Sequence, residues 1–171
     1  MPHVVIGGVA VSIVGEPRVT LDLDVLALVE QERWGSLVEA GAIHGLHPRI
    51  SDAIEFAARS RVLLMLHRPS GVPVDLTLGT LPFERDAISH ATVIDLRGIQ
   101  VPVARVEDLI VMKAVAHREI DLSDVGRLLL NPDLDLISTR ERIAEFASIL
   151  DAPEILDDFD RAARRVRESK P

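Results

Sequence analysis

The stretch Arg18-Val19-Thr20-Leu21-Asp22-Leu23-Asp24 decides the fold that this chain of 171 residues is expected to adopt. Its polar and apolar residues alternate, which is typical of a β-strand. On a strand over residues 18–26, Asp22 and Asp24 share one face and lie side by side. Two neighbouring carboxylates repel each other and are costly to desolvate unless a cation joins them. The sequence therefore predicts a cation site on this strand.

A short apolar strand precedes this stretch and ends at two glycines. His3 to Ile6 form the predicted strand, Gly7-Gly8 follow it, and a short helix is expected over residues 9–14. Glycines leave backbone N–H groups open to a ligand, and a helix N-terminus attracts phosphate. Because Mg²⁺ usually takes one or two carboxylates plus substrate phosphates, the two features together indicate a metal-assisted nucleotide site. Taken alone, Gly7-Gly8 are explained equally well by a tight structural turn.

A third carboxylate lies in a later apolar strand. Asp75 is the only charged residue of Val72-Pro73-Val74-Asp75-Leu76-Thr77-Leu78. If this strand runs beside residues 18–26, three carboxylates converge. Two of them would then suit a pair of metal ions, and the third would activate an attacking hydroxyl. The alternative is a structural α/β protein without a ligand, whose acids point to solvent on separate faces.

The remaining pattern predicts a mixed α/β half up to about residue 104 and a helical half after it. In the first half we expect helical segments within 29–45, 51–58 and 81–90. Two hairpins are expected there, 61–67 with 72–78 around Pro69-Ser70-Gly71, and 91–96 with 99–103 around Arg97-Gly98. In the second half we expect helices over 105–114, 123–130, 138–150 (opened by a capping box at Ser138) and 153 to about 170.

Composition narrows the class of protein. A hydrophobic content of 47% supports a real core, and the absence of cysteine excludes disulfides and thiolate metal sites. A net charge of −8 argues against broad, non-specific binding to nucleic acid, although Arg18, Arg49, Lys113 and Arg118 would suit a local basic pocket. The start has no signal-peptide pattern and no apolar run is long enough for a membrane helix. We expect a cytoplasmic protein with no membrane partner, and leave open whether its native N-terminus extends upstream of Met1.

The order of these motifs resembles that of a known family. The order strand, Gly7-Gly8, short helix, Asp22-x-Asp24 and then Asp75 looks like the DNA polymerase beta-like nucleotidyltransferase superfamily. The segments 5–10 and 18–24 resemble AbiEii-type and related minimal bacterial nucleotidyltransferases. So does the later run Val106-Glu107-Asp108-Leu109-Ile110-x-Met112-Lys113, followed by Arg118 and Asp121-x-x-Asp124. The resemblance covers roughly residues 4 to 130. The glycine motif departs from the family pattern, because Val9 stands after Gly8 and no serine hydroxyl is present.

The resemblance implies an α+β fold, in which a short mixed sheet flanked by helices forms a catalytic core over residues 1–104. A helical subdomain over 105–171 would complete the nucleotide site. The implied reaction transfers a nucleoside monophosphate from an NTP to a hydroxyl of RNA or tRNA, a protein or a small molecule. It would need Mg²⁺, with Mn²⁺ as the alternative. The family includes toxin and antitoxin components, so a cognate toxin or antitoxin is a further expected partner. The alternative is a non-catalytic antitoxin-like or regulatory nucleotide-binding module with the same fold.

The resemblance also assigns roles to individual residues. Asp22, Asp24 and Asp75 would hold the metal and catalyse transfer, with Asp75 as the base. The residues implied in nucleotide binding are Gly7, Gly8, Arg18, Thr20, Lys113, Asp121 and Asp124. For the last two, the alternative is that they fix Lys113 and Arg118 in place.

Other residues have plainer interpretations. Lys113 suits a helix lysine that extends its amine to solvent over apolar neighbours. His44 and His47 are interpreted as loop residues, and Trp34 as a packing anchor. The basic segment 161–167 is typical of a solvated helix face, with RNA binding as the alternative.

Overall fold

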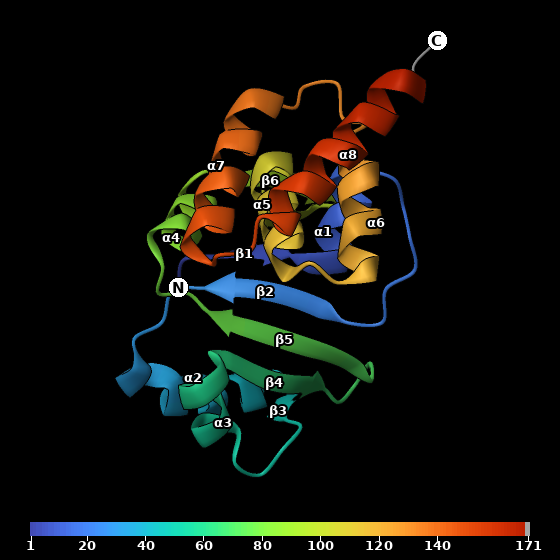
Figure 1. Ribbon diagram of the computed structural model, residues 1–171. Coiled ribbons are helices and arrows are strands. Elements are labelled where there is room, and N and C mark those ends of the chain that lie inside the picture. Colours follow the sequence, from blue (N-terminus) through green and yellow to red (C-terminus); the bar gives the residue numbers. More distant parts are fainter. Residues whose placement is uncertain (170–171) are drawn as a thin grey trace. The chain divides into compact units, whose positions relative to one another are not determined.

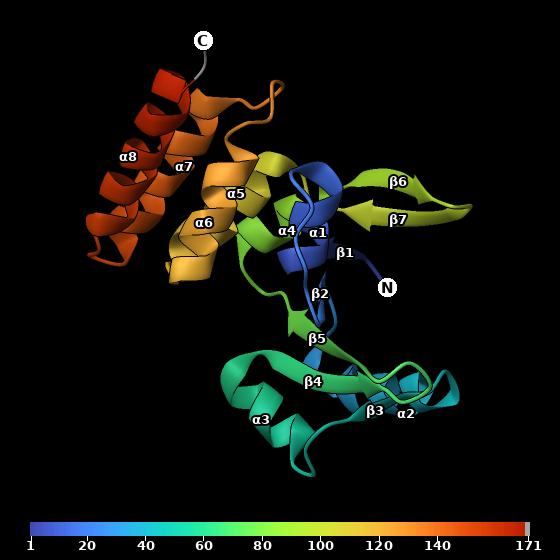
Figure 2. The same ribbon diagram turned by 90° about the vertical axis from the view of Figure 1, so that its right-hand side faces the viewer.

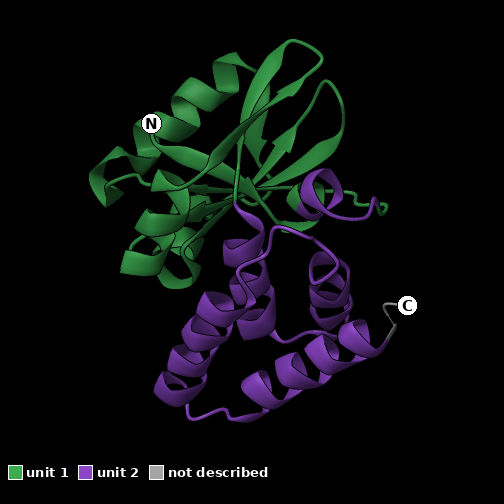
Figure 3. Cartoon of the chain, turned by 90° about the horizontal axis from the view of Figure 1, so that it is seen from above, with its two compact units in different colours: residues 1–10, 18–104 green, residues 11–17, 105–171 purple. Residues whose placement is uncertain are grey.

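The computed structural model describes residues 1–169, which divide into two compact units (Figure 3). The first unit contains Met1–Ala10 and Arg18–Ala104. The second contains Val11–Pro17 and the chain from Arg105 onward. The first helix, α1 (Gly7–Val14), therefore contributes its first turn to the first unit and its remainder to the second. Each unit is described by itself below.

The described part of the first unit holds a single seven-stranded mixed sheet. Its spatial order is β3-β4-β5-β2-β1-β7-β6, with β1 and β2 near the middle (Figure 1). The strands are β1 (His3–Ile6), β2 (Leu23–Ala27), β3 (Leu46–Pro48), β4 (Val62–His67), β5 (Val72–Leu78), β6 (Thr92–Leu96) and β7 (Ile99–Val103). The β1–β7 and β2–β5 pairs are parallel, and the other pairs are antiparallel. The expected mixed sheet flanked by helices is confirmed, and it is longer than the short sheet predicted.

Helices cover one face of the sheet at the β3–β4–β5 side. The chain enters α2 (Trp34–Ile43) through a 3-10 turn (Gln31–Arg33), and α3 (Ala53–Ser60) follows β3. A buried apolar cluster joins these helices to the strands: Ala27, Trp34, Ala53, Ala57, Leu63, Met65, Leu76 and Leu78. The indole of Trp34 also donates to the carbonyl of Val29 at 3.1 Å, which confirms Trp34 as a packing anchor. A further helix, α4 (Pro82–Ser89), contacts β1 and β2.

The second unit is helical. It contains α5 (Val106–Ala116), α6 (Glu119–Leu128), α7 (Leu136–Ile149) and α8 (Glu154–Ser169), with α5 in contact with the other three. Helix α5 is buried on most sides, as expected for a helix that is apolar all round. Figure 2 shows α7 and α8 side by side. No helix in the described residues is long and apolar enough to cross a membrane.

Two helices of the second unit begin earlier than predicted, each for its own local reason. Helix α6 begins at Glu119 rather than at 123, because the chain turns at His117, whose φ of 52° is left-handed, and Arg118 then precedes the helix as its N-cap residue. Helix α7 begins at Leu136 because Asp135, rather than Ser138, caps it: the Asp135 carboxylate accepts a hydrogen bond from the backbone N–H of Ser138 at 3.0 Å. The predicted end of the last helix at residue 170 lies outside the described residues.

Candidate functional site

The two glycines lie where β1 turns into α1, in close contact with side chains of the β2 region. Gly7 has a φ of 65°, a conformation that side-chain-bearing residues avoid. A β-carbon on Gly7 would lie only 1.8 Å from Asp24 Oδ2. A β-carbon on Gly8 would lie 2.7 Å from Arg18 Nη2 and 2.9 Å from Thr20 Oγ1. This turn therefore requires glycine, because the side chains of Asp24, Arg18 and Thr20 occupy the space that β-carbons would take.

The structure brings two of the three predicted carboxylates together. In the parallel pairing of β2 with β5, Asp24 is directly opposite Asp75. Directly opposite residues in a sheet point to the same face on strands about 4.8 Å apart, so these carboxylates are immediate neighbours. Both side chains are partly exposed. The parallel pairing of these strands thus produces an acidic pair beside the glycine turn.

Arg49 supplies a positive charge to Asp75. It follows the short strand β3, and its backbone N–H donates to the carbonyl of Leu64 on β4 at 2.9 Å. Leu64 is opposite Asp75 in the β4–β5 ladder, so one cross-strand row runs from Arg49 through Leu64 and Asp75 to Asp24. The Arg49 guanidinium donates to the Asp75 carboxylate. Like charges directly opposite on strands are destabilising, and Arg49 offsets this repulsion.

Asp22 lies differently from the predicted arrangement. Strand β2 begins at Leu23, not at residue 18, and residues 18–22 form an irregular segment. Thr20 Oγ1 donates to Asp22 Oδ1 at 2.8 Å, and this local bond takes the place of strand pairing. Val19 and Leu21 are 87% and 83% exposed, whereas Arg18 and Thr20 lie against Gly8. Asp22 and Asp24 are therefore not two positions of one regular strand.

The donor groups suit a magnesium ion that arrives together with phosphates. In the described residues, no group of three or more His, Cys, Asp or Glu side chains is gathered so that it could hold a metal by itself. Mg²⁺ does not need such a cage, because it commonly uses one or two carboxylates and completes its shell with phosphate oxygens and water. Asp24 and Asp75 provide the carboxylates, and the glycine turn at the start of α1 lies beside Asp24. The metal role of the three acids stays a prediction.

The predicted residues of the second unit form an ionic cluster with one another. Lys113 on α5 is 7% exposed, and Asp121 and Asp124 on α6 are fully buried. Lys113 Nζ lies 2.8 Å from Asp121 Oδ1 and 3.0 Å from Asp124 Oδ2, and Arg118 also donates to Asp121. Lys113 therefore does not extend to solvent. The observed contacts agree with the alternative interpretation, in which the two aspartates hold Lys113 and Arg118 in place.

Electrostatics keep Asp121 ionised within this cluster. Burial alone would raise the pKa of its carboxyl. Hydrogen bonds from Arg118 and Lys113, together with their charges, more than offset that effect, so the pKa of Asp121 lies below its usual value. Asp121 is thus ionised and paired with Lys113 and Arg118.

The sequence did not assign Arg49 to the site at Asp24 and Asp75. It only placed Arg49 among the basic residues that would suit a local basic pocket. Its position depends on β3, which is three residues long and ends in proline. Such a strand gives no periodic signal. The signal that was present is the lone acid of β5, which requires a partner on a neighbouring strand.

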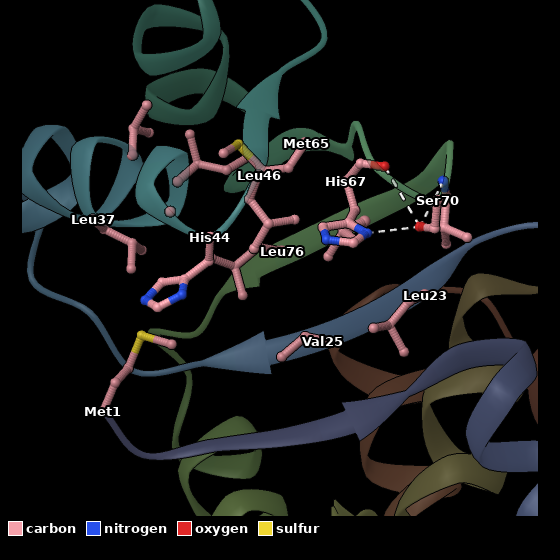
Figure 4. Close-up of a pocket in the computed structure, with 15 residues that line it drawn as sticks. Met1, Leu23, Val25, Leu37, His44, Leu46, Met65, His67, Ser70 and Leu76 are labelled. Carbon is pink, nitrogen blue, oxygen red and sulfur yellow. Dashed lines mark hydrogen bonds between the residues drawn. The ribbon is translucent and has the colours of Figure 1, made fainter.

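A large cavity lies on the other face of the same strands. It has a volume of about 570 Å³, and its lining is almost entirely aliphatic (Figure 4). Leu23 and Val25 line it from β2, and Val74 and Leu76 line it from β5. These residues alternate with Asp24 and Asp75 along the strands, so the acidic pair and the cavity are on opposite faces of the sheet.

Comparison with known proteins gives a similarity of fold only. No protein-family model and no curated protein matches the sequence. One similar solved structure is an antigenic nucleotidyltransferase-like protein from Paracoccidioides brasiliensis, at 14% identity and a TM-score of 0.46, covering 91% of this chain and 84% of that chain. Another is JHP933 from Helicobacter pylori, at 14% identity and a TM-score of 0.48, covering 98% of this chain and 84% of that chain.

Proposed function

We propose that the chain is a magnesium-dependent nucleotidyltransferase that moves a nucleoside monophosphate from an NTP to a hydroxyl acceptor. The observation that carries the proposal is the position of Asp24. Its carboxylate lies against Gly7 at the start of α1 and is directly opposite Asp75 on β5. A carboxylate pair beside a glycine turn at a helix start offers metal ligands and phosphate donors at one place.

Each residue has a defined task in this proposal. The backbone N–H groups at Gly7 and Gly8 bind phosphate oxygens, with Arg18 and Thr20 close beside them. Asp24 and Asp75 hold the metal, with Asp22 as the third carboxylate. Asp75 takes the proton of the attacking hydroxyl. Bound Mg²⁺ would stabilise negative charge on the attacking and leaving oxygens.

The test is an incubation with each α-labelled NTP and Mg²⁺, against total tRNA, a protein extract and the protein alone. We expect label transfer and pyrophosphate release. Asp24→Asn and Asp75→Asn should each lower the rate at least about 100-fold, because each removes a metal ligand or the base. Asp86→Asn is the matched control, since Asp86 is an exposed helix acid of the same unit, and it should react like the wild type. Transfer that persists in both site variants would overturn the proposal.

The second candidate is a non-catalytic nucleotide-binding module. It is favoured by the partners of two of the acids, because Asp75 is paired with Arg49 and Asp22 accepts from Thr20. Such a module would bind an NTP without releasing pyrophosphate. Calorimetric NTP binding with no pyrophosphate from any nucleotide and acceptor would select this candidate.

A further inference from the structure

The cavity beneath the sheet has the form of a ligand site rather than a flat contact surface. Its deepest lining residues are nearly inaccessible: Leu63 is 1% exposed and Met65 is 6% exposed. The exposed lining residues are Met1, His44, Ser70 and Val72. The volume of about 570 Å³ falls within the usual range for small-molecule pockets, roughly 300–1,000 Å³.

Two sides of the cavity belong to different elements. Strands β2, β4 and β5 provide one side, and Leu37, Val38 and Gly41 of α2 provide another. An apolar cavity of this kind is poorly filled by water, because water there lacks hydrogen-bonding partners. An apolar chain that enters it removes aliphatic surface from water, which is favourable.

The polar groups at the cavity indicate which head group a ligand with an apolar chain would carry. Among its lining residues, His44, His67 and Ser70 are the polar side chains, and none is an acid. His67 Nδ1 and Ser70 Oγ share a hydrogen bond of 2.7 Å (Figure 4). Within the described residues, neither His67 Nε2 nor the His44 ring has a hydrogen-bond partner. Imidazoles without a neighbouring carboxylate complement an anionic or hydrogen-bond-accepting head group.

We propose that this cavity binds an aliphatic carboxylate, with its chain against β2, β4 and β5 and its head group at His44 or His67. The site is on the reverse face of the strands that carry Asp24 and Asp75. It is separate from the nucleotide site, and its occupation requires neither nucleotide nor metal.

The chain contains its own reporters for this binding. Trp34 is the only tryptophan, is 6% exposed, and lies in the apolar cluster that includes Leu63, Met65 and Leu76. Of the three methionines, Met1 and Met65 line the cavity, whereas Met112 is on α5 in the other unit. We expect decanoate to change Trp34 fluorescence and to shift the ¹³C-methyl NMR signal of Met65, leaving that of Met112 in place.

A matched pair of variants tests the location. Gly41 and Gly35 are both on α2, but only Gly41 lines the cavity. A β-carbon at Gly41 meets Leu46 at 3.4 Å, an ordinary contact, and one at Gly35 meets nothing within 4 Å. Gly41→Leu should weaken decanoate binding about tenfold or more by occupying the space, whereas Gly35→Leu should bind like the wild type. If Gly41→Leu does not fold, the Met65 and Met112 signals of the wild type decide the location.

The head group is tested with decanol and with histidine variants. The double variant His44→Gln/His67→Gln should weaken decanoate binding about tenfold, the effect of one charge-assisted hydrogen bond, and change decanol binding little. His47→Gln is the control, because His47 does not line the cavity. Three results would overturn the proposal: no fluorescence or methyl response to decanoate, equal binding by Gly41→Leu and wild type, or a concentration-dependent dimer in sedimentation that decanoate does not dissociate. The last result would assign the cavity to a second copy of the chain.

Discussion

Arg49 donates a hydrogen bond to Asp75 from a backbone that is itself fixed to the carbonyl of Leu64 on the strand between them. Asp75 is directly opposite Asp24, so the Arg49 guanidinium binds one member of a pair of neighbouring carboxylates. A cation that binds both acids would likewise offset the repulsion between the two carboxylates. The ion pair and a metal ion are therefore competitors for Asp75, provided that the acids hold a metal as proposed.

This competition predicts the behaviour of Arg49→Met. Removing the guanidinium takes this partner from Asp75, and the affinity of the acidic pair for Mn²⁺, measured by EPR or calorimetry, should rise by up to about fivefold. That factor corresponds to an exposed ion pair, at most about 1 kcal/mol. Arg59→Met is the matched control, since the Arg59–Asp52 pair is exposed and its atoms are 3.9 Å apart. An unchanged or lower Mn²⁺ affinity in Arg49→Met would show that Arg49 does not compete for Asp75.

The contact between Gly7 and Asp24 gives a prediction about stability. Gly7→Ala places a methyl group 1.8 Å from Asp24 Oδ2, at a residue whose φ is 65°. Gly71→Ala is matched, because Gly71 has a φ of 70° and open space around its β-carbon. Both variants should lose about 1–2 kcal/mol to backbone strain, and Gly7→Ala about 1–3 kcal/mol more to overpacking.

The measurement for this pair is urea unfolding followed by circular dichroism. Equal free energies of unfolding for the two variants would mean that Asp24 moves away from Gly7 at no cost. The close approach of the two residues would then not be a constraint on the turn.

The sequence indicated which acids could converge but not how they are arranged. Three carboxylates were expected to converge if the strand Val72–Leu78 ran beside the aspartate strand; it does run beside it, and Asp24 lies opposite Asp75. Periodicity failed at Asp22, because a hydroxyl–carboxylate bond with Thr20 replaced the strand pairing that alternation implied. It also gave no indication of Arg49, whose position depends on a three-residue strand.

The lysine of α5 illustrates a different limit of sequence reasoning. Lys113 lies among apolar residues, a pattern that fits either a solvent-directed amine or a buried one. Its burial depends on Asp121 and Asp124, which come from another helix and pair with it only after α5 and α6 pack together. Ion pairs between two helices produce no periodic pattern in the sequence of either helix.

Lys113 is predicted to act first as a stability residue. Lys113→Met would leave two buried carboxylates short of a partner and should lower the free energy of unfolding by about 3–5 kcal/mol. The same change in an Asp121→Asn/Asp124→Asn background should cost clearly less, because the acids are then uncharged. Urea unfolding of the four proteins measures both costs. Equal costs in the two backgrounds would contradict the pairing seen in the structure.

The pKa of Asp121 predicts how stability depends on pH. A carboxyl whose pKa is lower in the folded state than its unfolded value of about 3.9 stabilises the fold above that value, and this contribution is lost as pH falls through the folded pKa. The free energy of unfolding of the wild type should therefore fall as pH drops below about 4. Asp121→Asn should be less stable at neutral pH but should show a smaller fall in this range. Glu145→Gln, an exposed acid on α7, is the control and should keep the fall of the wild type. An Asp121→Asn protein that loses as much stability below pH 4 as the wild type would show that other acids control the acid range.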